Sequence, residues 1–175
     1  MTTPPVSSQP QFETRVPAGD TLERRVCASC GFVDYENPRI VVGAVVRVDD
    51  KILLCRRAIE PRLGFWTLPA GYLELGETPE EGVRREAREE ACADLTLGPL
   101  LAVYTIRPIG QVQLIYRATL QGDFAAGPES LEVRLFDWAD IPWADLAFQT
   151  VEWALHHDRA IAEGRAAGIF GNAAA

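Results

Sequence analysis

GYLELGETPEEGVRREAREEACA, residues 71 to 93, is the stretch that decides the fold of this chain of 175 residues. Within it, Thr78 is followed by Pro79, and Glu81 comes three residues after the Thr. A Thr hydroxyl caps a helix N-terminus, Pro suits the first helical position, and a Glu three residues on completes a capping box. The pattern predicts a helix that begins at Pro79 and ends near residue 93.

The predicted helix has three different faces when its residues are placed at steps of about 100°. An acidic sector contains Glu86, Glu89 and Glu90, with Gly82 one turn earlier. The next sector is a narrow apolar stripe, and the remaining side is basic apart from Glu81. The apolar residues are Val83, Ala87 and Ala91, and the basic residues are Arg84, Arg85 and Arg88.

The acidic face has two interpretations that the helix alone leaves open. In the first, the helix is solvated and Arg85 pairs with Glu81 or Glu89 at a spacing of four residues. In the second, the like-charged pair Glu86 and Glu90, which costs about 0.2 to 0.5 kcal/mol in a bare helix, faces a bound cation. Mg²⁺ takes oxygen ligands and typically links a few carboxylates to substrate phosphates.

Spacing outside the helix favours the cation. Gly71, five residues, Glu77, seven residues and then REAREE at 85 to 90 resemble the box that defines the Nudix hydrolase family. One position departs, since Cys92 stands where the box has Gly. Because Cys is small and is tolerated in helices, this change is expected to alter the end of the helix without removing a metal ligand.

The resemblance extends over most of residues 22 to 160 to the zinc-ribbon-bearing branch of FAD and ADP-ribose pyrophosphatases. It implies Mg²⁺ or Mn²⁺ bound by Glu86, Glu89, Glu90 and the carbonyl of Gly71, with Arg85 and Glu77 orienting these ligands. The matching stretches are residues 37 to 43, 53 to 82, 108 to 112 and 127 to 143.

The chain order favours an α/β fold, which the resemblance specifies as a Nudix α/β/α sandwich with a mixed sheet. Strands are expected at 40 to 48, 51 to 56, 95 to 107, 111 to 120 and 131 to 138, a loop at 57 to 70, and a second helix at 145 to 163. The expected divisions are a disordered tail (1–21), a degenerate zinc-ribbon-like segment (22–39), the Nudix domain (40–165) and a flexible C-terminal tail (166–175).

A carboxylate within reach of a metal-bound water can act as a general base. Glu86 is one candidate. Glu132, and Glu129 nearby, lie where Nudix enzymes often place another catalytic acid, although either one is equally well explained as a surface residue beside a strand. The expected catalytic set is therefore Glu86, Glu89, Glu90, Arg85 and Glu132.

The pair Cys27 and Cys30 resembles the second knuckle of a zinc ribbon, but a structural zinc needs four ligands. Residues 1 to 26 contain neither Cys nor His. We therefore expect a metal-free ribbon without structural zinc. The alternative is a zinc ion shared between two subunits of a homodimer.

The substrate follows from the branch resemblance: FAD or ADP-ribose, cleaved with release of AMP. Arg57 is a candidate for phosphate binding, and Trp66 or Tyr104 for stacking, although the setting of Trp66 in FWTLPAG favours core packing over stacking. NADH, dinucleoside polyphosphates and nucleoside triphosphates stay open as substrates. A nucleotide-sensing regulator without hydrolysis is the alternative function, and it is disfavoured because every charged residue of the box is present.

The composition limits the other classes of function. A net charge of −8 and a pI near 4.8 disfavour nucleic-acid binding, which usually needs a basic face. No apolar run approaches the roughly 18 residues of a membrane span, and four cysteines are too few for a secreted disulfide scaffold. A cytoplasmic protein is expected, whose partner is a small nucleotide.

Overall fold

The structure, a computed structural model, describes residues 10 to 172 and separates after Asn37 into two units. The larger unit is built around β4 (Arg39–Val48), which is β-branched along most of its length and is buried from residue 42 to 46. This strand continues through a turn at Asp49 into β5 (Lys51–Arg57), with Val48 opposite Lys51. The two strands predicted at residues 40 to 48 and 51 to 56 are confirmed, and they form a hairpin.

The larger unit contains a mixed sheet of seven strands in the order β10-β5-β4-β9-β8, with β6 beside β5 and β7 beside β4. β4 and β9 are parallel, while the other neighbours are antiparallel. The three later strands agree with the predicted ranges to within two residues. The strands are β6 (Trp66–Thr67), β7 (Ala70–Tyr72), β8 (Asp94–Ile106), β9 (Gln111–Gln121) and β10 (Ser130–Phe136).

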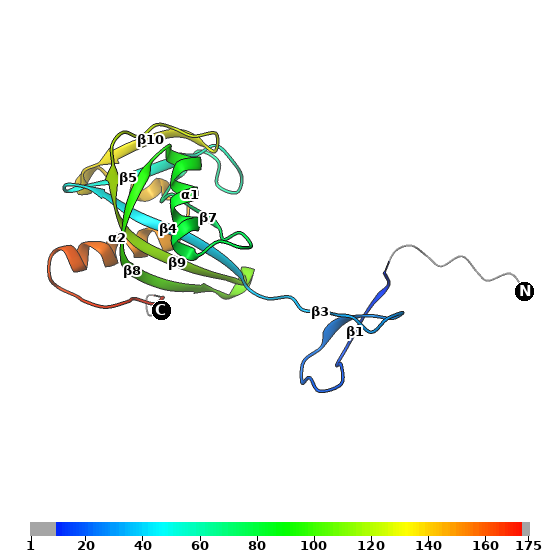
Figure 1. Ribbon diagram of the computed structural model, residues 1–175. Coiled ribbons are helices and arrows are strands. Elements are labelled where there is room, and N and C mark those ends of the chain that lie inside the picture. Colours follow the sequence, from blue (N-terminus) through cyan, green and yellow to red (C-terminus); the bar gives the residue numbers. More distant parts are fainter. Residues whose placement is uncertain (1–9, 173–175) are drawn as a thin grey trace, which may run out of the picture. The chain divides into compact units, whose positions relative to one another are not determined.

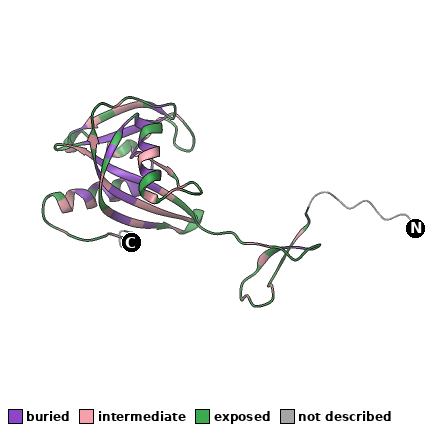
Figure 2. Cartoon of the chain, in the orientation of Figure 1, coloured by how far each residue is buried: buried purple, intermediate pink, exposed green. Residues whose placement is uncertain are grey.

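The two helices cover opposite faces of this sheet, which confirms the α/β/α sandwich (Figure 1). Side chains alternate along β4, so Val42, Ala44 and Val46 pack beneath α1 (Pro79–Ala91), whereas Val45 packs beneath α2 (Gln149–Ala162). Burial is concentrated in the strands between the helices (Figure 2). Three 3₁₀ turns complete the unit: η1 (Arg107–Ile109), η2 (Trp138–Asp140) and η3 (Trp143–Asp145).

Both ends of α1 follow from its sequence. The Thr78 hydroxyl accepts the N–H of Glu81 at 3.2 Å, and the Glu81 carboxylate accepts the N–H of Thr78 at 2.7 Å, which confirms the capping box. The helix ends at Ala91 because Cys92 adopts a left-handed conformation, with φ 46° and ψ 32°. Glycine is favoured at such a position. Cys92, which replaces the Gly of the box, therefore affects the end of the helix, as expected.

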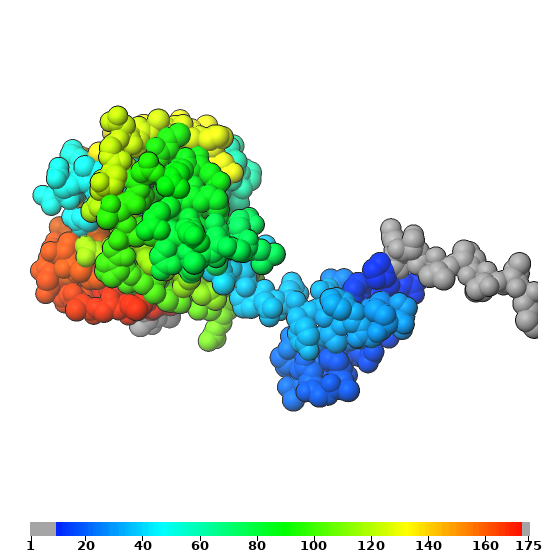
Figure 3. All heavy atoms as spheres, in the orientation of Figure 1, coloured from blue at the N-terminus to red at the C-terminus, as the bar shows by residue number. Residues whose placement is uncertain are grey.

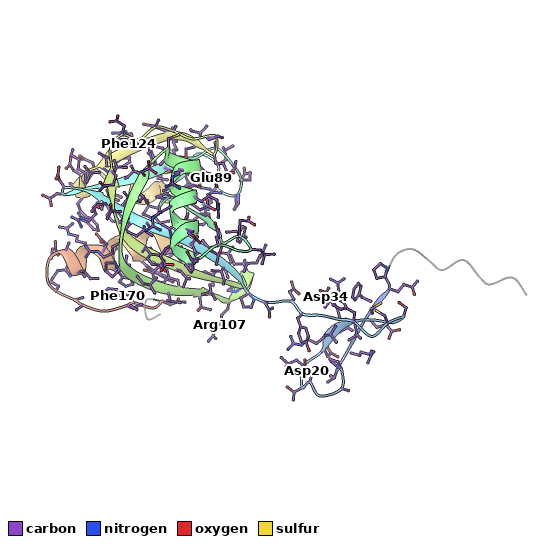
Figure 4. The ribbon with its side chains drawn as sticks, in the orientation of Figure 1. Asp20, Asp34, Glu89, Arg107, Phe124 and Phe170 are labelled. Carbon is purple, nitrogen blue, oxygen red and sulfur yellow. The ribbon has the colours of Figure 1, made fainter. Side chains whose placement is uncertain are left out.

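The C-terminal segment is ordered as far as Asn172, so the prediction of a flexible tail from residue 166 is wrong for its described part. Phe170 donates its N–H to the carbonyl of Leu101 and accepts the N–H of Val103, both at 2.9 Å. Its ring stacks on His157 at 4.1 Å between centroids, below β8 (Figure 4). The backbone pairing and the partly buried ring offset the entropy of ordering this segment. Residues 173 to 175 lie outside the described residues.

The smaller unit is a three-stranded antiparallel sheet with the order β1-β2-β3. Its strands are β1 (Phe12–Arg15), β2 (Arg24–Cys27) and β3 (Val33–Asp34). β1 contradicts the prediction that residues 1 to 21 form a disordered tail, because Phe12 pairs with Cys27 and its ring carries the guanidinium of Arg25 at 4.8 Å. Residues 1 to 9 lie outside the described residues. No helix within residues 10 to 172 is long and apolar enough to cross a membrane.

Candidate active site

Arg85 is the centre of an ion network that joins α1 to the loop before it. Its guanidinium donates two hydrogen bonds to Glu77, from Nε at 3.0 Å and from Nη2 at 2.7 Å. Nη1 donates to Glu86 at 2.6 Å and to Glu89 at 2.9 Å, while Nη2 also donates to the carbonyl of Tyr72 at 2.9 Å. The bonds from Arg85 lower the pKa of Glu77 to about 2. One guanidinium therefore orients three carboxylates and the carbonyl of Tyr72 at the end of β7.

Glu86 lies directly against the backbone of β7. A Cβ added to Gly71 would lie 2.4 Å from the carboxylate atoms of Glu86, so only glycine leaves room for this contact. A Cβ at Gly82 would lie 2.9 Å from both Val42 on β4 and Glu77 Oε1. These two glycines let the acidic face of α1 lie close to the sheet. The segment that includes α1 forms part of the surface of the larger unit (Figure 3, green).

Glu90 is the more deeply buried carboxylate, with 4% of its surface exposed. Its Oε2 accepts the N–H of Ala70 at 3.0 Å. Burial, assisted by the negative charge of Glu86, raises the pKa of Glu90 to about 8. Burial also raises the pKa of Glu86, against the opposing effect of Arg85. The like-charged pair four residues apart is thus held in a poorly solvated place, where a cation would stabilise it.

The loop between β9 and β10 closes the C-terminal end of α1. Ala125 donates its N–H to the carbonyl of Ala91 at 2.9 Å, and Gly127 donates to that of Glu90 at 3.0 Å. A Cβ at Gly127 would lie 1.8 Å from the Glu89 carbonyl oxygen, so the approach requires glycine. These bonds satisfy carbonyls that a helix end leaves free.

This loop also carries Glu129 toward the carboxylates. After burial, the negative charge of Glu129 is a further cause of the raised pKa of Glu86 and of Glu90. Its backbone carbonyl accepts the N–H of Ala58 at 2.8 Å, which fixes the loop against the end of β5. The buried hydroxyl of Ser130 has no hydrogen-bond partner within residues 10 to 172.

Glu132, the residue expected to supply another catalytic acid, is not brought into this cluster. It lies opposite Arg56 on β5, with 3.9 Å between Nη1 and Oε2, and 3.7 Å from Nε of Arg134. The strand register shifts between Ser130 and Glu132, so sequence spacing does not indicate which acid turns toward α1. Glu129, whose charge affects Glu86 and Glu90, is the better placed of the two.

The three residues predicted to bind the substrate do not lie together in the structure. Burial is the main cause of the raised pKa of Glu90, and the positive charge of Arg57 opposes this rise. Arg57 therefore lies near the carboxylates. Its Nε donates to the Pro61 carbonyl at 2.8 Å, and its guanidinium lies 5.4 Å from the ring centre of Phe148, a side chain that the sequence did not single out. Phe148 is 37% exposed, so it offers the aromatic surface that the other two candidates lack.

Trp66 and Tyr104 are core residues on the α2 face of the sheet. Trp66 packs edge to face on Phe136 at 4.8 Å and is 7% exposed. Tyr104 is fully buried, and its hydroxyl lies 2.7 Å from Nδ1 of His157. Neither ring presents a free face for stacking, which contradicts the substrate-binding role expected for them. An aromatic residue in a strand is compatible with either role, and only burial distinguishes them.

The donors around α1 fit a hard divalent cation. They are carboxylate oxygens of Glu86, Glu89 and Glu90 and the carbonyl of Gly71, which is the ligand type that Mg²⁺ and Mn²⁺ prefer. Because Gly71 has no Cβ, the Glu86 carboxylate lies directly against the strand backbone at this residue. Within residues 10 to 172, no three acidic, His or Cys side chains form a ready-made cage. Arg85 bonds two of the ligands instead.

The residues of the smaller unit do not fit a zinc ion on their own. Cys27 and Cys30 are its only thiols, it has no His, and a structural zinc takes four ligands. Cys27 is buried, with Sγ 3.2 Å from the hydroxyl of Ser29, whereas Cys30 is exposed. The Ser29 hydroxyl is the main cause that lowers the pKa of Cys27 to about 7. Two of the four donors are present in one chain.

Two family models match the chain, and each falls largely on one of the two units. The model described as NUDIX domain matches residues 37 to 156, and the zinc-ribbon model described as Nudix N-terminal matches residues 9 to 36. The second match begins before β1, which agrees with the structure in assigning that strand to the small unit.

Relatives and solved structures agree with this assignment. The ADP-ribose pyrophosphatase of Methanocaldococcus jannaschii is 35% identical over 113 residues, 62% of this chain and 67% of that protein. The MutT-like protein of Streptomyces ambofaciens is 44% identical over 82 residues, 47% of this chain and 51% of its own length. The crystal structure of a NUDIX hydrolase from Nitrosomonas europaea superposes with a TM-score of 0.88 at 41% identity, covering 94% of this chain and 96% of that one. With an intact acidic box held on a sandwich of this kind, the chain belongs to the Nudix hydrolase family.

Proposed function

We propose that this protein is a divalent-metal-dependent pyrophosphohydrolase that cleaves the diphosphate of ADP-ribose into AMP and ribose 5-phosphate. The observation that carries the proposal is the pair Glu86 and Glu90, both buried against β7 with raised pKa values. Within residues 10 to 172, Glu90 bonds the N–H of Ala70 and no cationic side chain. The similarity to the ADP-ribose pyrophosphatase of M. jannaschii supports this substrate in particular.

Each charged residue of the site has a definite task in this reaction. A bound Mg²⁺ or Mn²⁺ neutralises the substrate phosphates and lowers the pKa of a bound water. Glu86, Glu89, Glu90 and the Gly71 carbonyl would hold it. Arg85 keeps Glu86 and Glu89 in place through its bonds of 2.6 and 2.9 Å.

Two further residues complete the proposal. Glu129, whose charge acts on Glu86 and Glu90, would accept the proton of the attacking water. Arg57 can bond a phosphate oxygen, and the exposed Phe148 next to it can stack on the adenine.

The test is a panel of nucleotides with Mg²⁺, Mn²⁺ or a chelator, with products separated by chromatography. ADP-ribose should give AMP and ribose 5-phosphate only when the cation is present, and ¹⁸O-labelled water should place the label on one product phosphate. FAD, NADH, dinucleoside polyphosphates and nucleoside triphosphates are the competing substrates. Rapid cleavage of one of these with ADP-ribose untouched would overturn the substrate, and binding without any cleavage would overturn the enzyme.

A further inference from the structure

A second buried ion network lies on the α2 face of the sheet, away from α1. Asp158 on α2 is 1% exposed and accepts hydrogen bonds from two arginines. Nη1 of Arg47 on β4 donates at 2.8 Å, and Nε of Arg117 on β9 donates at 2.6 Å. The carboxylate is therefore fully paired, and it fixes both guanidiniums in place.

The strand register puts two hydroxyl side chains beside these arginines. Arg47 lies opposite Thr119 across the β4 and β9 pair, and Thr119 lies opposite Thr96 across the β9 and β8 pair. Residues opposite one another in neighbouring strands share a face. Arg117, two residues before Thr119 on the same strand, shares that face as well.

These side chains line a cavity of about 230 Å³. Its remaining wall includes Gly98 and Pro99, where a shift in the β8 register lies between residues 97 and 100. A Cβ at Gly98 would lie 3.3 Å from the carbonyl oxygen of Arg117, so the bulge lies tightly over the strand that supplies this arginine.

The charge in this cavity is unbalanced. The guanidiniums of Arg47 and Arg117, whose side chains are 22% and 26% exposed, share the single buried carboxylate of Asp158. Asp50 lies 3.8 Å from Arg47 but is fully exposed, so its contribution is small. None of the residues that line the cavity is acidic. Nη1 and Nη2 of Arg117 have no hydrogen-bond partner within residues 10 to 172.

We propose that this cavity binds a phosphate group, either as inorganic phosphate or as the phosphate of a small monoester. A guanidinium offers planar, paired donors that match phosphate oxygens, and it is the side chain that proteins favour for this purpose. Arg117 has both Nη groups available, and the hydroxyls of Thr96 and Thr119 are further donors. The site is separate from the diphosphate substrate, which the carboxylates of α1 would bind through a cation on the other face of the sheet.

The test is calorimetric titration of the full chain with inorganic phosphate, in a chelator so that the catalytic carboxylates repel anions. Thr119→Glu adds a carboxylate from an exposed position beside both arginines, and binding should become at least tenfold weaker. Thr105→Glu, at an exposed position of β8 outside this cavity, is the matched control and should bind phosphate as the parent protein does. Thr96→Val removes one donor at constant shape and should weaken binding a few-fold.

Three outcomes would overturn the proposal: no phosphate binding by the parent protein, equal binding by Thr119→Glu, or loss of binding in Thr105→Glu alone, which would place the anion elsewhere. Parallel titrations with adenosine monophosphate and with adenosine distinguish the source of the phosphate. Binding at least tenfold tighter for the monophosphate than for inorganic phosphate, with none for adenosine, identifies a monoester. Equal binding identifies the free ion.

Discussion

Both helices are tied to the sheet by ion networks, but the excess charge of the two networks is opposite. Around α1, the single guanidinium of Arg85 bonds Glu77, Glu86 and Glu89, and Glu90 lies buried beside them. Around α2, the single carboxylate of Asp158 bonds two guanidiniums. Each network joins a helix to the segments next to it, and each keeps charge that its own partners do not balance.

This difference separates two roles that an ion network can have. A network that only held a helix in place would gain most from equal numbers of each charge, because an unpaired charge out of water is costly. An excess of one sign therefore indicates a missing counterion: a cation for the carboxylates of α1 and an anion for the arginines of α2. The predictions that follow test each network for a ligand-binding role and a purely structural role.

The largest effect is expected for Glu90→Gln. Glutamine keeps the size of the side chain but removes the charge of a metal ligand, so kcat should fall by a factor of at least about 100. The midpoint of urea unfolding without metal should not decrease, because Glu90, with its pKa raised to about 8, is already largely neutral at pH 7, and Gln keeps an oxygen that can accept the N–H of Ala70. Steady-state kinetics on ADP-ribose with saturating Mg²⁺ measures the first quantity. Glu152→Gln, an exposed position of α2, is the control and should leave both quantities unchanged.

Unfolding of Glu90→Gln would assign this carboxylate a structural role instead, and full activity would remove it from the site. Glu89→Gln sharpens the comparison. Glu89 is exposed, with 53% of its side chain accessible, and lies on the outer side of α1 (Figure 4). The same loss of turnover there, with no cost in stability, is expected if both residues are metal ligands.

A smaller effect, on stability, is expected for Asp158→Asn. This change leaves two half-buried guanidiniums without their shared carboxylate, and should lower the free energy of unfolding by about 2 to 3 kcal/mol. Asp50→Asn removes the exposed partner of Arg47 and should cost less than about 0.5 kcal/mol. Urea unfolding with unchanged m-values measures both. Equal effects of the two variants would mean that burial gives Asp158 no special importance.

The sequence predicts the α1 network better than the α2 network, for a physical reason. The ligands of α1 lie on one helix and one loop, so local spacing places Glu86, Glu89 and Glu90 on one face. The α2 network joins Arg47, Arg117 and Asp158, which are up to 111 residues apart. Only the strand register and the helix packing bring them together, and neither is visible in local periodicity.

The same limit explains the individual errors. Tyr104 and Trp66 are suitable for stacking by residue type, but Tyr104 on β8 and Trp66 on β6 both turn into the core cluster beneath α2, which buries their rings. The sequence favours Glu132 over Glu129, because the register shift between Ser130 and Glu132 in β10, which affects which acid turns toward α1, is not visible in local spacing. The strands β6 and β7 are too short, at two and three residues, to show any periodicity.

A still smaller effect is expected at the end of α1. The cap of α2, Glu163, has an ordinary φ of −85°, whereas the cap of α1 is Cys92 with a φ of 46°. Cys92→Gly relieves the left-handed conformation at the cost of a more flexible unfolded chain, and should raise the free energy of unfolding by about 0.5 to 1 kcal/mol. Thermal unfolding measures the change, and Glu163→Gly is the control that should not stabilise. A destabilised Cys92→Gly would show that the thiol has contacts that matter more than its backbone conformation.

The smallest effect is expected in the three-stranded ribbon. There the argument rests on the number of possible zinc ligands and not on an excess of charge. Two thiols are half of the set that zinc needs, so the protein as purified should hold well under one zinc per chain. Cys30→Ser removes an exposed thiol and should change stability by less than about 0.5 kcal/mol. Elemental analysis and hydrogen exchange at β2 provide the two measurements.

Cys92→Ser, which removes an exposed thiol of the other unit, controls for the loss of a thiol as such. Stoichiometric zinc, with loss of protection at β2 on chelation or in Cys30→Ser but not in Cys92→Ser, would contradict the prediction. Because one chain supplies only two thiols here, that result would require the other ligands to come from a second copy.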